Sequence, residues 1–359
     1  MSPFLPALID ALSPPFVALI LLVLLVLAAF SAWTVARIER RYPPTGRFVD
    51  ANGARLHVVE RGSQAEPVPT IVLHGASGNL YDQLRAPYAR RLGHTLFVDR
   101  PGHGYSTRGG PENDSPEGQA DTILALMDAL RIERAVVMGH SYAGAVAAAL
   151  ALNHPTRVAG LVLLSPVTHP WPGGNTLWYY DLGAVPVIGP VFARTLLVPF
   201  GLRRMACAVR GVFAPQPVPS NYEERAATAL ALRPRNFLAN AADLTSLYPV
   251  VERLAPRWHE ISAPTIVIAG EDDRIVWTDI HARAFARAVP HARLVTVPGL
   301  GHKPDYWTAD LLADAIVGVR GDPARFEPSI PRPPAIGTEQ VGDDARGIET
   351  GPDTPATAR

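Results

Sequence analysis

The stretch AVVMGHSYAGAVAAALAL, from Ala135 to Leu152, places a serine between an apolar run and an alanine-rich run. The first run is typical of a buried strand and the second of a helix. Ser141 stands at the junction, with Gly139 two residues before it and Ala143 two residues after it. A serine on so sharp a turn needs small neighbours at both positions, because larger side chains would collide there. The pattern predicts a nucleophile elbow, and a serine in an ordinary turn is the alternative.

The rest of the chain alternates between strand and helix patterns in the same way. Short apolar runs typical of strands buried on both faces lie at residues 70–73, 95–98, 135–138, 161–164, 265–269 and 293–297. Helical patterns separate several of these runs, at residues 119–130 and 142–152 among others. Two alternating segments, 46–50 and 55–60, are split by Asn52-Gly53 and predict a hairpin. The predicted fold class is α/β, with a mostly parallel sheet and helices on both of its faces.

Between residues 169 and 257 the alternation stops, and helical patterns mix with prolines and aromatic residues. We expect this part to be a helical cap inserted into a core formed by residues 46–168 and 258–320. Residues 321–359 contain few apolar side chains, which predicts a disordered tail. Cys207 is the only cysteine, which excludes an internal disulfide bond, and we expect it to be a small buried residue.

The N-terminal segment of residues 1–15 precedes an uncharged stretch, FVALILLVLLVLAAFSAWTVA, at residues 16–36. Its length of about 21 residues matches a helix that crosses the hydrocarbon core of a bilayer. A cleaved signal peptide and a buried helix are the alternatives, but the first segment lacks the basic residues of a signal peptide. Arg37, Arg40 and Arg41 follow the stretch, and basic residues prefer the cytoplasmic side. We therefore expect a single-pass protein of a bacterial-type inner membrane, with its main domain in the cytoplasm.

Four separated motifs, in their order along the chain, resemble those of the α/β-hydrolase family, in particular serine hydrolases with a helical cap. They are LHGASGN at residues 73–79, DRPGHGYS at 99–106, GHSYAG at 139–144, and the acid and histidine segments of the next paragraph. The resemblance implies that Ser141 is the nucleophile. It also implies that His74-Gly75-Ala76 is the oxyanion loop, with the amides of Ala76 and Tyr142 as its two donors. The residues that support these motifs are His74, Gly75, Gly139, His140 and Ala143, of which Ala143 departs from the glycine that the family often has.

The acid and the base of the same family follow in chain order. Gly270-Glu271-Asp272-Asp273 resembles the family's G-x-x-D motif, which implies Asp273 as the acid that orients the base. Asp272 and a solvated acidic turn are the alternatives. After the last apolar run, VPGLGH places glycines beside His302, which the resemblance implies as the general base.

Together these residues predict a serine hydrolase that cleaves carboxylic esters through an acyl-enzyme. The apolar cap segment at residues 185–200 suggests apolar acyl or lipid esters as substrates, and packing of this segment on the core is the alternative. Thioesterase, amidase, carbon–carbon hydrolase and perhydrolase chemistry are alternatives, and a non-catalytic, membrane-tethered binding protein is a more distant one. We expect no metal and no cofactor, because the sequence has no H-E-x-x-H motif or His/Cys cluster. The 33 basic and 33 acidic residues balance, which argues against nucleic-acid binding. The expected partners are a small ester substrate and the lipid bilayer, and the oligomeric state stays open.

Overall fold

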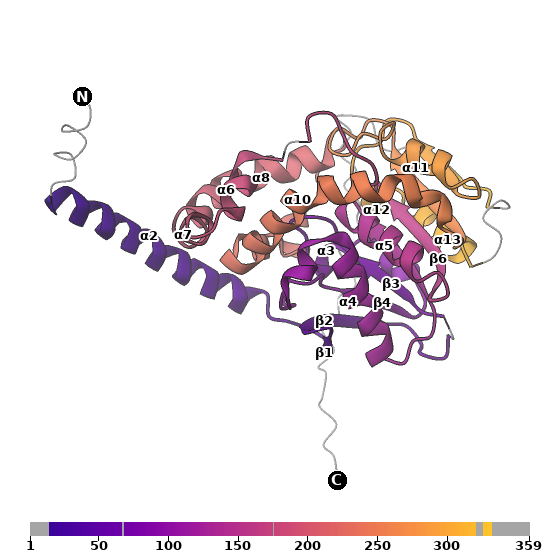
Figure 1. The fold of residues 1–359 in the computed structure, drawn as a ribbon, viewed down its shortest axis with the longest axis horizontal. Coiled ribbons are helices and arrows are strands. Elements are labelled where there is room, and N and C mark those ends of the chain that lie inside the picture. Colours follow the sequence, from indigo (N-terminus) through magenta and orange to yellow (C-terminus); the bar gives the residue numbers. More distant parts are fainter. Residues whose placement is uncertain (1–13, 67, 175, 321–325, 332–359) are drawn as a thin grey trace, which may run out of the picture.

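The computed structural model describes residues 14–66, 68–174, 176–320 and 326–331. An eight-stranded sheet forms the centre, and helices lie on both of its faces (Figure 1). The strands are β1 (Arg47–Ala51), β2 (Ala54–Arg61), β3 (Thr70–Leu73), β4 (Thr95–Val98), β5 (Ala135–His140), β6 (Val158–Leu164), β7 (Thr265–Gly270) and β8 (Arg293–Val297). Their spatial order is β1-β2-β4-β3-β5-β6-β7-β8, and every neighbouring pair from β4 onward is parallel. The predicted α/β fold with a mostly parallel sheet is confirmed.

The antiparallel edge of the sheet is the hairpin of β1 and β2, as the sequence predicts. Its turn residues both have positive φ, 47° at Asn52 and 73° at Gly53. A two-residue hairpin loop needs this conformation, which asparagine and glycine adopt more readily than other residues. β2 then pairs antiparallel with β4 and joins the hairpin to the parallel strands.

Each strand contributes to two apolar cores, because successive side chains point to opposite faces of the sheet. The helices of this part are α3 (Leu80–Leu84), α4 (Pro116–Ala129), α5 (Tyr142–Asn153), α11 (Ala282–Ala288), α12 (Pro304–Trp307) and α13 (Ala309–Gly318), with 3₁₀ helices at residues 87–91, 111–114 and 255–260. One core packs Ile71, Val137 and the strand residues on the same face against α4, α5 and α11. The other packs Val72, Val136 and the strand residues on the opposite face against α3 and α13.

The chain between β6 and β7 forms a separate group of helices, here called the cap (Figure 1). Its helices are α6 (Trp178–Ala184), α7 (Ile188–Thr195), α8 (Leu197–Phe213), α9 (Tyr222–Arg225), a 3₁₀ helix (Thr228–Leu232) and α10 (Pro234–Leu254). The ring of Phe237 on α10 stacks on Tyr180 of α6, with 5.9 Å between their centroids. Cys207 is exposed, so the expectation of a buried cysteine is wrong. It lies on the side of α8 that turns away from the buried Val209 and Phe213.

The N-terminal helix α2 (Pro14–Arg41) extends beyond the predicted stretch at both ends. Within the described residues it is the one helix long and apolar enough to cross a membrane, a statement about length and composition alone. Its C-terminal part lies beside the cap (Figure 1), where the hydroxyl of Ser31 donates to the carbonyl of Thr195 at 3.1 Å. Glu39 lies 3.1 Å from Arg233 of the cap in an ion pair. The helix is therefore packed on the cap and is not a free tether.

Most of the predicted tail, residues 321–325 and 332–359, lies outside the described residues, as do residues 1–13. Residues 326–331 are described, and Phe326 is buried against the core formed with α13.

Candidate active site

Ser141 occupies the turn between β5 and α5 with φ 56° and ψ −119°, a conformation that is strained for a residue with a side chain. The small neighbours that the sequence offers are needed there. A Cβ atom added to Gly139 would lie 2.2 Å from the carbonyl oxygen of Ala143. The backbone of α5 therefore passes directly against residue 139, and the serine projects from the resulting sharp turn.

His302 and Asp273 are brought together from the loops that follow β8 and β7. Nδ1 of His302 lies 2.7 Å from Oδ2 of Asp273. The other carboxylate oxygen of Asp273 accepts the backbone amides of Ile275 and Val276, each at 2.9 Å. Burial raises the pKa of Asp273, but His302 and these amides outweigh it and hold the pKa below its ordinary value. The charged carboxylate keeps the proton of the imidazole on Nδ1, which leaves Nε2 free to accept one. The alternative acid, Asp272, is exposed.

Ser141 and His302 open into one cavity of about 300 Å³ between the core and the cap. Gly75 and Ala76 of the predicted oxyanion loop also line it, as do the next three residues up to Asn79. The cap contributes mostly apolar side chains, among them Tyr179, Leu197, Phe200, Met205, Val209, Leu232 and Phe237. Ser141 and His302, the predicted nucleophile and general base, therefore face one cavity whose lining is mainly apolar.

Of the two predicted oxyanion donors, Ala76 lines this cavity, and Tyr142 directly follows Ser141, which lines it too. A Cβ atom on Gly75 would lie 3.1 Å from Cβ of Ser141, so glycine allows the loop after β3 to approach the serine. Tyr142 is the first residue of α5, where helix amides have no partner within the helix. In the described part of the chain, the amides of Ala76 and Tyr142 donate to no other acceptor. Both are available to a developing negative charge.

Two of the motif histidines brace these loops. Burial and the charge of Lys303 lower the pKa of His140 to about 4, so the ring is neutral, and its Nε2 donates to the carbonyl of His302 at 3.0 Å. Burial and Arg100 lower the pKa of His74 well below its ordinary value. Nε2 of His74 accepts the amide of Arg100 at 3.1 Å. Each ring therefore forms a hydrogen bond with the backbone of a loop near Ser141.

A buried cluster around Lys303, the only lysine of the chain, was not predicted. Its ammonium lies 2.8 Å from carboxylate oxygens of both Asp82 and Asp305. Asp82, His140 and Asp305 have potential metal-ligating atoms within 4.8 Å of one another. The ammonium already places a positive charge between these carboxylates. A metal ion would add a second positive charge there, so the cluster does not fit a metal site.

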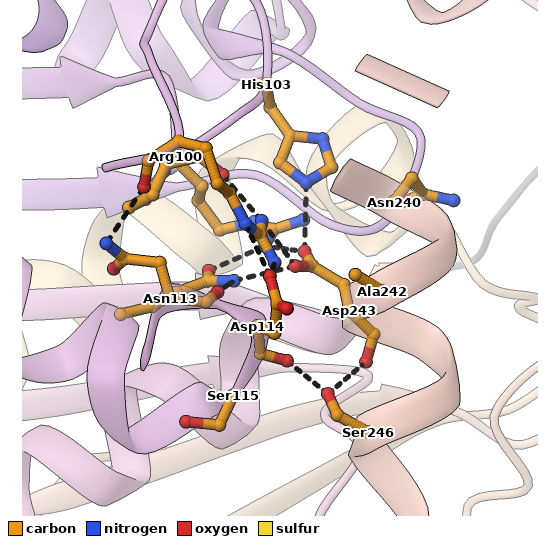
Figure 2. Close-up of polar contacts among 12 residues, drawn as sticks. Arg100, His103, Asn113, Asp114, Ser115, Asn240, Ala242, Asp243 and Ser246 are labelled. Carbon is orange, nitrogen blue, oxygen red and sulfur yellow. Dashed lines mark hydrogen bonds and ion pairs between the residues drawn. The ribbon is translucent and has the colours of Figure 1, made fainter. Parts of the chain in front are cut away.

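A second unpredicted cluster joins the core to the cap (Figure 2). Arg100 and Asp243 are fully buried and form an ion pair of 2.6 Å, and His103 contacts the same carboxylate at 2.9 Å. Burial raises the pKa of Asp243, but Arg100 and His103 outweigh it and hold this pKa well below its usual range. The motif DRPGHGYS contains Arg100 and His103, but nothing local in the sequence indicates their partner on α10.

Comparison with known proteins agrees with this architecture. A 2-hydroxy-6-oxononadienedioate/2-hydroxy-6-oxononatrienedioate hydrolase of Cupriavidus pinatubonensis is 29% identical, over 72% of this chain and 89% of that protein. A 2-hydroxymuconate semialdehyde hydrolase of a Pseudomonas species is 30% identical over 39% of this chain, which spans half of that protein. Est816, an N-acyl homoserine lactone degrading enzyme, is 26% identical with a TM-score of 0.56, over 76% of this chain and 99% of that one.

A bacterial membrane phospholipase A is 23% identical with a TM-score of 0.60, over 89% of this chain and all of that one. The family model for the alpha/beta hydrolase fold matches residues 68–307, which include all the motifs on which the resemblance rests. The chain belongs to the alpha/beta hydrolase family.

Proposed function

We propose that this protein is a serine hydrolase that cleaves uncharged carboxylic esters with apolar acyl groups. One observation carries the proposal: Ser141, on its strained turn, and His302, paired with Asp273, open into the same mainly apolar cavity. Serine hydrolases on unrelated folds share this set of groups and their roles.

The mechanism follows from the positions of these groups. His302 takes the proton of the Ser141 hydroxyl through Nε2 as the oxygen attacks the acyl carbon. The charge that develops on the carbonyl oxygen is held by the amides of Ala76 and Tyr142. His302 then gives its proton to the leaving alcohol, which departs and leaves the acyl group on Ser141. Water, activated by the same imidazole, releases the acid and restores the serine.

The charges around the cavity favour an uncharged substrate. Lys303 lines the cavity, but Asp82 and Asp305 oppose its charge at close range. A substrate carboxylate near it would meet a net negative group. The apolar cap side chains favour acyl chains instead, since each buried CH₂ contributes on the order of 0.8 kcal/mol. Among the similar proteins, Est816 degrades N-acyl homoserine lactones, which are cyclic esters with an acyl chain.

The test is a series of p-nitrophenyl esters from acetate to octanoate, assayed with the full chain in detergent. We expect kcat/KM to rise with chain length. A profile that is highest at acetate and falls steadily would show that the apolar side chains of the cap only pack within the protein and do not bind an acyl chain. A fluorophosphonate probe should label Ser141, and no labelling would favour the non-catalytic binding protein.

Carbon–carbon bond hydrolysis is the second candidate, because the curated relatives above are named for 2-hydroxy-6-oxo acids and a muconate semialdehyde. Arg204 on α8 supports it: this exposed side chain lines the cavity, and no ion pair among the described residues involves it. A substrate carboxylate would fit there. If this candidate is right, a 2-hydroxy-6-oxo dienedioate is turned over faster than any ester, and Arg204→Gln lowers that turnover while ester cleavage is kept.

For α2 we propose a membrane anchor with the hydrolase in the cytoplasm. Large apolar side chains on this helix are exposed, among them Leu19, Leu21, Leu22, Leu25 and Val26. The arginines after Ala36 set the orientation by the bias of basic residues toward the cytoplasm. Alkaline phosphatase fused after Arg359 should be inactive in a bacterial host, and strong periplasmic activity would overturn the orientation. An intact N-terminus on the membrane-bound protein would exclude a cleaved signal peptide.

A further inference from the structure

The side chain of Arg100 donates hydrogen bonds to two backbone carbonyls of the proposed oxyanion loop. Its Nε donates to the carbonyl of His74 at 2.8 Å, and its Nη2 donates to the carbonyl of Gly75 at 3.2 Å. The guanidinium also lies over the ring of Tyr142, 4.4 Å from its centroid. Arg100 thus contacts the carbonyl of the residue that precedes Ala76 and the ring of Tyr142, which carry or adjoin the two proposed donor amides.

The contact with Gly75 has a direct consequence for the Ala76 amide. The carbonyl of Gly75 and the N–H of Ala76 belong to one planar peptide unit. Fixing the direction of the carbonyl therefore fixes the direction of the N–H on the opposite side. A cation at the carbonyl also withdraws electron density from the peptide, which makes its N–H a stronger donor.

The cap controls this arrangement through one face of α10. Asp243 accepts Nη1 of Arg100 at 2.6 Å, as Figure 2 shows. One turn earlier, Oδ1 of Asn240 accepts the amide of Ser77 at 2.6 Å, and its Nδ2 donates to the hydroxyl of Ser77 at 3.0 Å. Residues three apart on a helix lie on the same face. The cap therefore holds the chain at two points around the oxyanion loop: through Arg100 at Gly75, and directly at Ser77, the residue that follows the loop.

We infer that Arg100 is a positioning residue for oxyanion stabilisation and that Asp243 and Asn240 make this stabilisation depend on the docking of the cap. The inference rests on the proposed serine hydrolase and adds a dependence of its chemical step on the cap. Arg100 itself does not reach the substrate.

Arg108 provides a matched control. It pairs with the same Asp243, 2.7 Å away on the other carboxylate oxygen, and with Asp114. Its backbone acceptor is the carbonyl of Pro101, and it makes no hydrogen bond to residues 74–76 in the described chain. If Arg100 only stabilises the fold, its loss and the loss of Arg108 should have similar effects on the chemistry.

The experiment measures the rate at which a fluorophosphonate labels Ser141 in the full chain in detergent, and kcat and KM for p-nitrophenyl octanoate per labelled site. In labelling, the serine oxygen bonds to phosphorus, fluoride leaves, and the phosphoryl oxygen occupies the oxyanion position. Arg100→Met should slow labelling and lower kcat by about 10- to 100-fold with KM kept, less than the 10²–10³-fold cost of deleting an oxyanion donor. Arg108→Met should lower the melting temperature. Because Arg108 does not contact the oxyanion loop, this variant should keep both rates within about twofold of wild type.

Asn240→Ala, which frees the Ser77 amide, keeps the test valid if Arg100→Met fails to fold. It should slow labelling severalfold in a chain that melts cooperatively. Equal labelling rates in Arg100→Met and Arg108→Met, or wild-type labelling in Asn240→Ala, would overturn the inference alone. Wild-type protein that is not labelled at all would overturn the proposed function, and the inference with it.

Discussion

Nζ of Lys303 lies 2.8 Å from Oδ2 of Asp82, although 221 positions separate the two residues in the sequence. The second carboxylate on this ammonium, Asp305, is fully buried. The hydroxyl of Tyr222 from the cap donates to Asp82 at 2.9 Å. The residue next to the proposed base is therefore fixed by carboxylates of two helices, α3 and α12, and by a residue of the cap.

Loss of this ammonium should destabilise the fold strongly, because it leaves two buried carboxylates without a cation. We expect Lys303→Met to cost about 3–5 kcal/mol, as broken buried ion pairs do. Chemical denaturation of the full chain in detergent measures it. Adding Asp82→Asn should recover part of the loss, and a double variant less stable than Lys303→Met would contradict this account.

Substitutions at the proposed triad should separate chemistry from folding. Ser141→Ala should remove fluorophosphonate labelling, and His302→Ala should remove turnover. Asp273→Asn should lower kcat by about 10⁴-fold, because the imidazole then holds the wrong tautomer. The exposed neighbour Asp272 is the control, and Asp272→Asn should keep wild-type kcat. If Asp272→Asn and Asp273→Asn are equally impaired, the acid is assigned wrongly.

The tight turn at Ser141 predicts a large difference between two glycine substitutions. Gly139→Ala should cost about 2 kcal/mol or more, since its Cβ would overlap the carbonyl of Ala143. Gly211 lies in α8, and a Cβ there would have no neighbour within 4 Å. Gly211→Ala should gain about 0.5–1 kcal/mol from the lower entropy of the unfolded chain. Similar melting temperatures for the two variants would mean that the turn is looser than described.

Stability should fall on mild acidification. Burial and Arg100 lower the pKa of His103 from 6.5 to about 4, and burial and Lys303 do the same for His140. Below pH 6.5 the unfolded chain binds protons that the folded chain excludes, so stability is lost as the pH falls from about 6.5 to 4. Each histidine can contribute up to about 1.4 kcal/mol per pH unit in this window. His103→Gln should flatten the profile measured by denaturation, and an unchanged stability between pH 7 and 4 would refute the assignment.

The sheet and the turn at Ser141 follow from local patterns, which is why the sequence predicts them well. The runs at residues 70–73, 95–98 and 293–297 coincide with β3, β4 and β8. Strands buried on both faces need continuous apolar residues, and the glycine and alanine around Ser141 reflect a steric need within five residues. These patterns can be recognised without knowing which distant parts of the chain pack against them.

The two buried charge clusters lack such signals. Asp243 and Lys303 look like surface residues in the sequence, because nothing nearby marks the partner that neutralises them. The sequence contains only a weak signal for the packing of α2 on the cap. Ser31 and Thr34 are the two polar residues of the apolar stretch, and both are buried together with Ile38 on one face of the helix. A hydropathy pattern alone does not distinguish that face from one that contacts lipid.

The same face lets α2 support the cap, in addition to its proposed role as a membrane anchor. Cutting the chain after Arg41 would remove the proposed anchor, but it would also expose the carbonyl of Thr195 and leave Arg233 without Glu39. The cover over the Ser141 cavity would then lose its outer support. A fragment that begins after Arg41 should therefore discriminate less between octanoate and acetate esters than the full chain does. An ester series measured on that fragment would understate the chain-length selectivity of the full protein.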